Sequence, residues 1–160
     1  MNRYQITADI DVTLWLGALL HYKHVPSKIE YINLEELFES ENVYFPTRDE
    51  LQNQLKTVTK NLEYEFLAYL RELTDKSLFK IDNVVVYLPL SEEAFIAQFG
   101  RVSTFVNGTF DAVVETSASQ EDVFDVVERA LNMAMDSENL RIENLDALSV
   151  ACLDVREIGD

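Results

Sequence analysis

Residues 4–16, YQITADIDVTLWL, alternate between apolar and polar side chains along their whole length. Successive side chains of a β-strand point to opposite faces, so this period of two predicts a strand with one buried face. The apolar positions are Tyr4, Ile6, Ala8, Ile10, Val12, Leu14 and Leu16. A second interpretation ends the strand near Ile10 and begins a helix capped by Asp11. The unbroken alternation favours the strand.

A long helix is predicted in the middle of the chain. Thr47 and Glu50 form a capping box directly after Pro46, which is a typical helix start. Apolar residues then recur at spacings of three and four as far as Thr74, which predicts an amphipathic helix.

Two shorter helices follow. Residues 91–99, SEEAFIAQF, are introduced by Pro89 and stopped by Gly100. Ser119 and Asp122 cap a second one within residues 118–139, which has an apolar stripe and an acidic face.

Two β-hairpins are predicted from turn signals between β-rich runs. The turns are Asp82-Asn83 in SLFKIDNVVVYL and Asn107-Gly108 in RVSTFVNGTFDAVVE. Asn-Gly is the strongest short hairpin signal, because both residues tolerate the positive φ that a type I′ turn requires.

The order of elements predicts the fold class. With further strands at residues 28–34 and 146–155, we expect an α+β fold in one acidic domain over residues 1–160. Its antiparallel sheet would contain the two hairpins and pack against one long and two shorter helices.

Net charge is the strongest compositional signal. The chain has 29 acidic and 13 basic residues, a net charge of −16, and residues 107–160 alone hold 13 acids against 3 bases. Direct nucleic-acid binding is disfavoured because phosphate contacts need a basic patch. A negative field instead attracts basic protein surfaces.

The acidic helix is the first candidate for a functional surface. Glu121, Asp125, Glu128 and Asp136 share the side opposite the apolar stripe, and Arg129 is the only base between residues 115 and 140. Carboxylates four residues apart are displaced by about 6 Å along a helix axis, a spacing comparable to that of backbone phosphates. Such a face can occupy a nucleic-acid groove in another protein. The alternative is a solvated face that keeps the protein soluble.

Catalytic and metal sites find little support. Asp9 and Asp11 project to one side of the predicted strand and suit a metal or acid-base pair, but no third acid stands at a recognisable spacing. His21 and His24 supply at most two zinc ligands. Cys152 lies in an apolar run, which predicts a buried, inert thiol. We therefore expect no enzyme activity, no cofactor and no metal.

Aromatic residues beside acidic ones suit a protein–protein interface. Trp15 falls on the polar face of the first strand, and Phe45 lies in the short run VYFP. Both are candidate partner-binding anchors, with packing in the core as the alternative.

In its general character the chain resembles the small acidic inhibitors made by bacteriophages and mobile elements, which block restriction enzymes, CRISPR effectors and other nucleic-acid-binding proteins. The resemblance lies in size, charge and lack of catalytic motifs. It implies a cytoplasmic, non-enzymatic nucleic-acid mimic that binds a basic nucleic-acid-binding protein, without direct nucleic-acid or membrane binding. A structural subunit that forms a homo-oligomer is the alternative. A homodimer does not exclude inhibition, because it extends the acidic row across two subunits.

Overall fold

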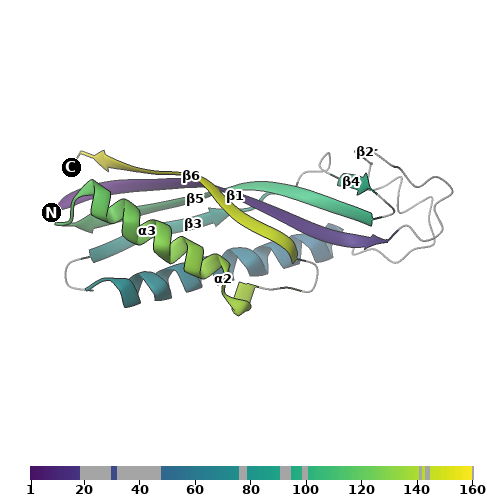
Figure 1. Ribbon diagram of the computed structural model, residues 1–160, viewed down its shortest axis with the longest axis horizontal. Coiled ribbons are helices and arrows are strands. Elements are labelled where there is room, and N and C mark those ends of the chain that lie inside the picture. The colour runs from purple at the N-terminus through teal and green to yellow at the C-terminus, as the bar shows by residue number, and fades with distance from the viewer. Residues whose placement is uncertain are drawn as a thin grey trace.

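The computed structural model has an antiparallel sheet with two helices packed on one side of it (Figure 1). It describes residues 1–18, 30–31, 48–75, 79–90, 95–98, 101–140, 142 and 145–159. Within these ranges, no helix has the length and apolar character needed to cross a membrane. The α+β class expected from the sequence is confirmed.

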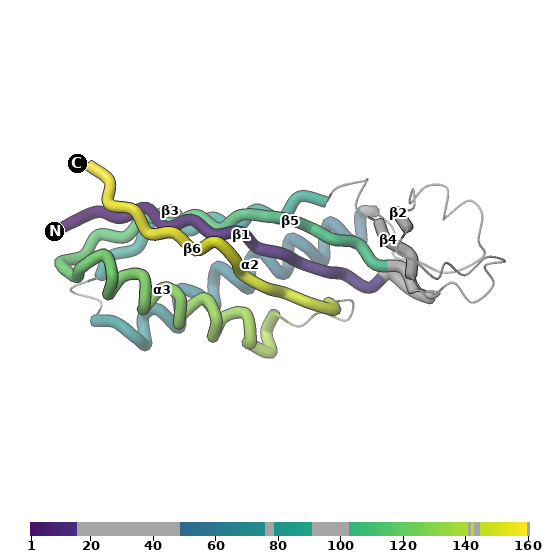
Figure 2. Tube along the Cα trace, turned by 45° about the horizontal axis from the view of Figure 1, so that its top comes forward, coloured from purple at the N-terminus to yellow at the C-terminus, as the bar shows by residue number. Residues whose placement is uncertain are grey.

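The predicted first strand is the centre of the sheet. Strand β1 (Asn2–Ala18) pairs along its length with β5 (Arg101–Thr116) on one side and with β6 (Leu145–Ile158) on the other (Figure 2). The other side of β5 pairs with β3 (Phe79–Tyr87) and β4 (Phe95–Gln98), and β4 pairs with the two-residue β2 (Glu30–Tyr31). All these pairings are antiparallel. Among the described strands, β3 and β6 therefore lie at opposite edges of the sheet.

The alternation of β1 corresponds to its two environments. The apolar side chains from Tyr4 to Leu14 are buried, whereas Asp9, Asp11 and Trp15 are exposed. The hydroxyl group of Tyr4 keeps a polar partner by donating to the carbonyl of Ala118 at 3.0 Å. Residues 16–18 continue the strand, so the helix considered after Ile10 does not form.

The helices α2 (Arg48–Leu73) and α3 (Gln120–Met135) supply the second layer, and a short 3-10 helix (Glu138–Leu140) follows α3. Their apolar stripes pack against the sheet. For example, the ring of Phe66 on α2 meets that of Phe110 on β5 edge to face, with centroids 4.8 Å apart, a favourable aromatic geometry. The sequence predicts the long helix over the residues of α2; the predicted capping residue Thr47 lies outside the described part.

The hairpin predicted at Asn107-Gly108 is wrong, because β5 runs straight through both residues. The same partner strand continues on both sides of them, with Asp11 opposite Asn107 and Ile10 opposite Gly108. Glycine is needed here for space. A Cβ at position 108 would lie 2.1 Å from the carbonyl oxygen of Tyr87. Close approach of β3, and not a turn, explains the glycine.

The hairpin predicted at Asp82-Asn83 is also wrong. Both residues lie within β3, which pairs with β5 before and after them. The pairing shifts between Asp82 and Val85, and Asn83 has a φ of 55°. A β-bulge places one extra residue in a strand in this way, and asparagine tolerates positive φ better than most residues.

The short helix predicted over residues 91–99 is wrong where the structure describes it. Residues 95–98 form β4, which pairs with residues 101–104 of β5. Strand β3 pairs only with residues 109–116 of β5, so the other end of β5 is available for β4. This tertiary pairing outweighs the local helix signal. The last predicted strand, residues 146–155, is confirmed and extends to Ile158.

Candidate functional site

Helix α3 begins as its sequence predicts. Ser119 has the extended backbone of a cap residue, and its hydroxyl oxygen accepts a hydrogen bond from the backbone N–H of Asp122 at 3.2 Å. Five small or aliphatic side chains of the helix are buried: Val123, Val127, Ala130, Leu131 and Ala134. This stripe fixes which side of α3 faces the solvent.

The four acidic residues singled out on α3, namely Glu121, Asp125, Glu128 and Asp136, are all exposed. We call them the acidic face. Within the described residues, the two ion pairs join Arg3 to Glu115 and Arg156 to Asp154, so neither neutralises this face. The last turn of α3 contains no basic residue. An acid at the C-terminal end of a helix, such as the cap residue Asp136, interacts unfavourably with the helix dipole by a few tenths of a kcal/mol. Helix stability therefore does not explain the presence of Asp136.

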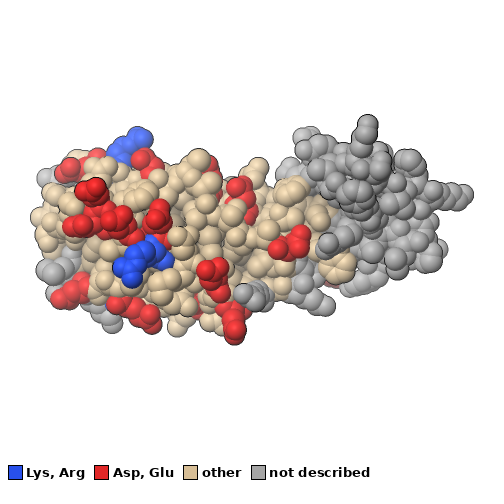
Figure 3. All heavy atoms as spheres, in the orientation of Figure 1, with Lys and Arg blue, Asp and Glu red and all other residues tan. Residues whose placement is uncertain are grey.

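The charge on the visible side of the molecule lies in groups. Figure 3 shows acidic side chains in several separate clusters along the described part, with uncharged surface between them and few basic groups. Such clusters favour discrete charge pairs with a partner over one continuous acidic strip.

The sheet presents a second surface, away from both helices. We call it the open face: the side chains of β1, β3, β5 and β6 on the side opposite α2 and α3. Its large exposed apolar residues are Trp15, Val85, Tyr87 and Phe105, with exposed fractions of 38%, 50%, 62% and 43%. The hairpin predicted over residues 77–88 gives no reason to expect Val85 and Tyr87 on an exposed surface, because the sequence does not show which side of a strand the helices cover.

The two candidate anchors do not join the acidic face. Trp15 pairs with Ser103 on the open face, with the sheet between it and the helices. Phe45 lies outside the described residues. The structure therefore separates the aromatic anchor that it describes from the carboxylates of α3.

Asp9 and Asp11 are exposed neighbours on the open face. The predicted burial of Cys152 is wrong: the thiol is exposed, at a bulge of β6 where its φ is 55°. Its hydrogen bond to Asp9, and the negative charge there, raise the pKa of the Cys152 thiol. No group of three or more potential metal ligands occurs among the described residues; His21 and His24 lie outside them.

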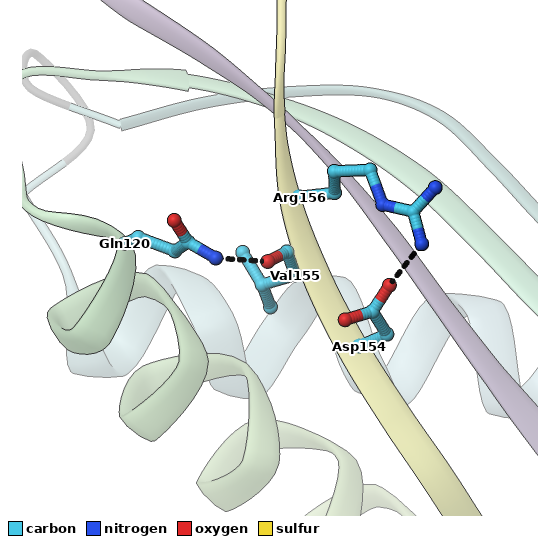
Figure 4. Close-up of polar contacts among 4 residues, drawn as sticks. All are labelled: Gln120, Asp154, Val155 and Arg156. Atoms are coloured by element: carbon cyan, nitrogen blue, oxygen red, sulfur yellow. Dashed lines mark hydrogen bonds and ion pairs between the residues drawn. The ribbon is translucent and has the colours of Figure 1, made fainter.

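The edge strands β6 and β3 each receive a side chain from a helix. The side-chain amide of Gln120 donates to the carbonyl of Val155 on β6 at 2.6 Å (Figure 4). At the other edge, the carboxylate of Glu63 accepts from the backbone N–H of Val86 on β3 at 3.0 Å. Both contacts occupy backbone groups that another strand would otherwise use.

A shallow hollow of about 410 Å³ lies beside the first of these contacts, lined by Gln120, Glu121, Phe124, Asp154 and Val155. Two of its five residues are acidic, and one of them, Glu121, belongs to the acidic face. Because Asp154 forms an ion pair with Arg156, Glu121 is the acid of this hollow that has no ion pair with a described residue.

Comparison with known proteins gives no relative from which to transfer a function. No protein-family model matches the chain, and no curated protein matches it.

Proposed function

We propose that this protein is a non-enzymatic, acidic protein-binding inhibitor that blocks a basic nucleic-acid-binding protein. The observation that carries the proposal is the acidic face of α3. Its four carboxylates are exposed, and none of them forms an ion pair with a described residue. A lysine- or arginine-lined groove that normally holds DNA or RNA supplies the complementary charge. Occupation of that groove excludes the nucleic acid.

The net charge of −16 affects how fast a basic partner reaches the acidic face. Long-range attraction steers a basic partner towards an acidic protein and raises the association rate. Because the Debye length is about 8 Å at physiological salt, this attraction weakens as salt is added. Binding that depends on the acidic face is therefore salt-sensitive.

A pull-down from cell lysate at low and at high salt tests the proposal. The test variant is Glu121→Gln/Asp125→Asn/Glu128→Gln, which removes three charges from α3. The matched control, Glu72→Gln/Asp146→Asn/Glu157→Gln, removes three charges from exposed residues outside α3.

We expect wild type and control to retain a nucleic-acid-binding protein at low salt, and the α3 variant to lose it. Equal retention by the α3 variant would contradict the proposal. A partner lost equally by both variants would show that net charge alone, and not the acidic face, directs binding.

The second candidate is a structural subunit that forms a homo-oligomer. The exposed apolar side chains of the open face favour it, because such groups often mark interfaces. Light scattering coupled to size exclusion tests this candidate: an apolar oligomer persists at high salt, and a chain that is monomeric at both salt concentrations would contradict it.

A further inference from the structure

The open face combines exposed apolar side chains with carboxylates in a fixed register. Asp9 and Asp11 are two positions apart on β1, about 7 Å between Cα atoms. Asp111 of β5 pairs with Thr7 and is therefore a diagonal neighbour of Asp9. Phe105 pairs with Thr13, which makes it a diagonal neighbour of Asp11. Asp111 thus lies within side-chain reach of Asp9, and the ring of Phe105 lies within reach of Asp11.

Ion pairs divide this face into two parts. Towards the start of β1, Glu115 pairs with Arg3 and Asp154 pairs with Arg156, each at 3.3 Å. Asp9, Asp11 and Asp111 have no ion pair with any described residue. The middle of the open face therefore offers negative charge to a ligand, whereas its end is already neutralised.

We infer that the open face is a docking surface for an arginine-containing segment of the basic partner protein. The inference rests on the proposed function, and it adds a second contact surface and the chemistry of the segment. A guanidinium group pairs with carboxylates in a bidentate manner and also stacks on aromatic rings. Asp11 on β1 offers the carboxylate, and its diagonal neighbour Phe105 on β5 offers the aromatic ring. Tyr87 lies two strands from Asp9, in the row Tyr87–Thr109–Asp9, and offers a further ring.

The dimensions of the face suit a protein partner. From Arg3 to Trp15 the central strand spans roughly 40 Å. Four strands, roughly 19 Å wide, cover the half of this length where β3 pairs with β5, and three strands, roughly 14 Å wide, cover the rest. The area is therefore about 650 Å², close to the roughly 800 Å² that each partner contributes to a standard protein–protein interface. The helix contacts at Val155 and Val86 hinder addition of a strand at either edge, so the face is the better-suited surface of the sheet.

A second copy of the chain fits this face less well. Stacking two open faces about a two-fold axis through the middle of the face would bring Asp9, Asp11 and Asp111 of one copy towards the same carboxylates of the other. Like charges brought together at an interface are unfavourable. Charge complementarity therefore selects a basic segment.

The test uses the full chain and its own fluorescence. The single tryptophan, Trp15, lies on the open face and is 38% exposed, so its emission reports occupation. The probe is a short synthetic peptide of alternating arginine and leucine, titrated at physiological salt. A peptide of lysine and leucine is the comparison.

Two pairs of variants make the titration specific. Asp9→Asn/Asp11→Asn/Asp111→Asn is compared with the α3 variant Glu121→Gln/Asp125→Asn/Glu128→Gln, since each removes three charges. Tyr87→Ala/Phe105→Ala is compared with Tyr64→Ala/Met133→Ala, which removes exposed apolar side chains from the helices. Circular dichroism and thermal unfolding verify that each variant folds.

We expect saturable binding of the arginine peptide, weakened about tenfold by each open-face variant and less than about twofold by its control. The lysine peptide should bind more weakly than the arginine peptide. The inference would be overturned by absent saturation, by equal weakening in variant and control, or by equal binding of both peptides. A dimer that Tyr87→Ala/Phe105→Ala dissociates would assign the face to a second copy and also overturn it.

The same variants in the lysate pull-down separate this inference from the proposed function. Loss of the partner with both charge variants, and its retention by the control Glu72→Gln/Asp146→Asn/Glu157→Gln, supports both. Loss with the α3 variant alone leaves the proposed function and removes the inference. Loss of the partner with the open-face variant alone supports the open face as the docking surface and contradicts the role of α3. Retention of the partner by both variants contradicts the proposed function and the inference.

Discussion

Gln120, the first residue of α3, donates its side-chain amide to the backbone carbonyl of Val155 at 2.6 Å. The two residues are 35 positions apart in the chain, and the contact joins the start of a helix to the edge strand β6. Glu63 makes the corresponding contact from α2 to Val86 on β3. The edge strands β3 and β6 are thus both contacted from the helix layer, whereas the open face lies on the side away from both helices.

The Gln120 contact should contribute measurably to stability. We expect Gln120→Ala to lower the free energy of unfolding by about 1 kcal/mol, the usual net contribution of one hydrogen bond. Chemical denaturation measures the change. Gln52→Ala, at an exposed glutamine of α2, is the matched control and should change stability by less than about 0.5 kcal/mol. Equal effects of the two substitutions would contradict the role of Gln120.

Glu63 should protect the β3 edge through its acceptor oxygen. We expect Glu63→Ala to cost about 1 to 2 kcal/mol in unfolding free energy and to speed hydrogen exchange at Val86, because this N–H loses its partner. Glu63→Gln keeps an acceptor oxygen and should retain most of the protection. Amide exchange measured by NMR distinguishes them. Unchanged protection of Val86 in Glu63→Ala would show that the contact does not form in solution.

Substitutions at positions 107 and 108 distinguish the continuous strand from the expected hairpin. A Cβ at Gly108 would lie 2.1 Å from the carbonyl oxygen of Tyr87 and 2.5 Å from a methyl carbon of Leu88. We therefore expect Gly108→Ala to destabilise the protein by about 1 to 3 kcal/mol, the usual cost of overpacking.

Asn107 is exposed within β5, so Asn107→Thr should cost less than about 0.5 kcal/mol, because threonine suits a strand. Urea unfolding of both variants provides the measurement. A type I′ turn would give a different result, since threonine at position 107 would then have to adopt positive φ.

Cys152 should react slowly with alkylating reagents for an exposed thiol. The hydrogen bond to Asp9 and its negative charge raise the pKa of the thiol, so less reactive thiolate is present at any pH below that pKa. Asp9→Asn removes the charge, lowers the pKa of Cys152 and should speed alkylation near pH 8. The chain has a single cysteine, so mass spectrometry follows the reaction directly. Asp111→Asn is the control, and equal rates in the two variants would contradict the effect of Asp9.

The sequence is sufficient to predict the elements whose burial pattern is periodic. Strand β1 follows from the alternation that begins at Tyr4, and helix α3 follows from its Ser119 cap and apolar stripe. The exposure of the acidic face follows from the same stripe, because residues opposite a buried stripe face the solvent.

The remaining features depend on contacts between distant residues. The Asn107-Gly108 pair is a hairpin signal in isolation, but pairing with β1 on both sides of it keeps β5 straight. The apolar neighbours of Cys152 predict its burial, but the bulge that turns it towards Asp9 is a property of the pairing with β1. The open face cannot be predicted from the sequence, because it depends on which side of the sheet the helices cover.

Competition with nucleic acid tests the central claim most directly. The protein is immobilised, loaded with the lysate partner at low salt, and washed with double-stranded DNA or RNA in amounts that leave the ionic strength unchanged. If the acidic face occupies the partner's nucleic-acid groove, the partner leaves the column bound to the nucleic acid. A partner that stays on the column and binds the nucleic acid there would contradict the account.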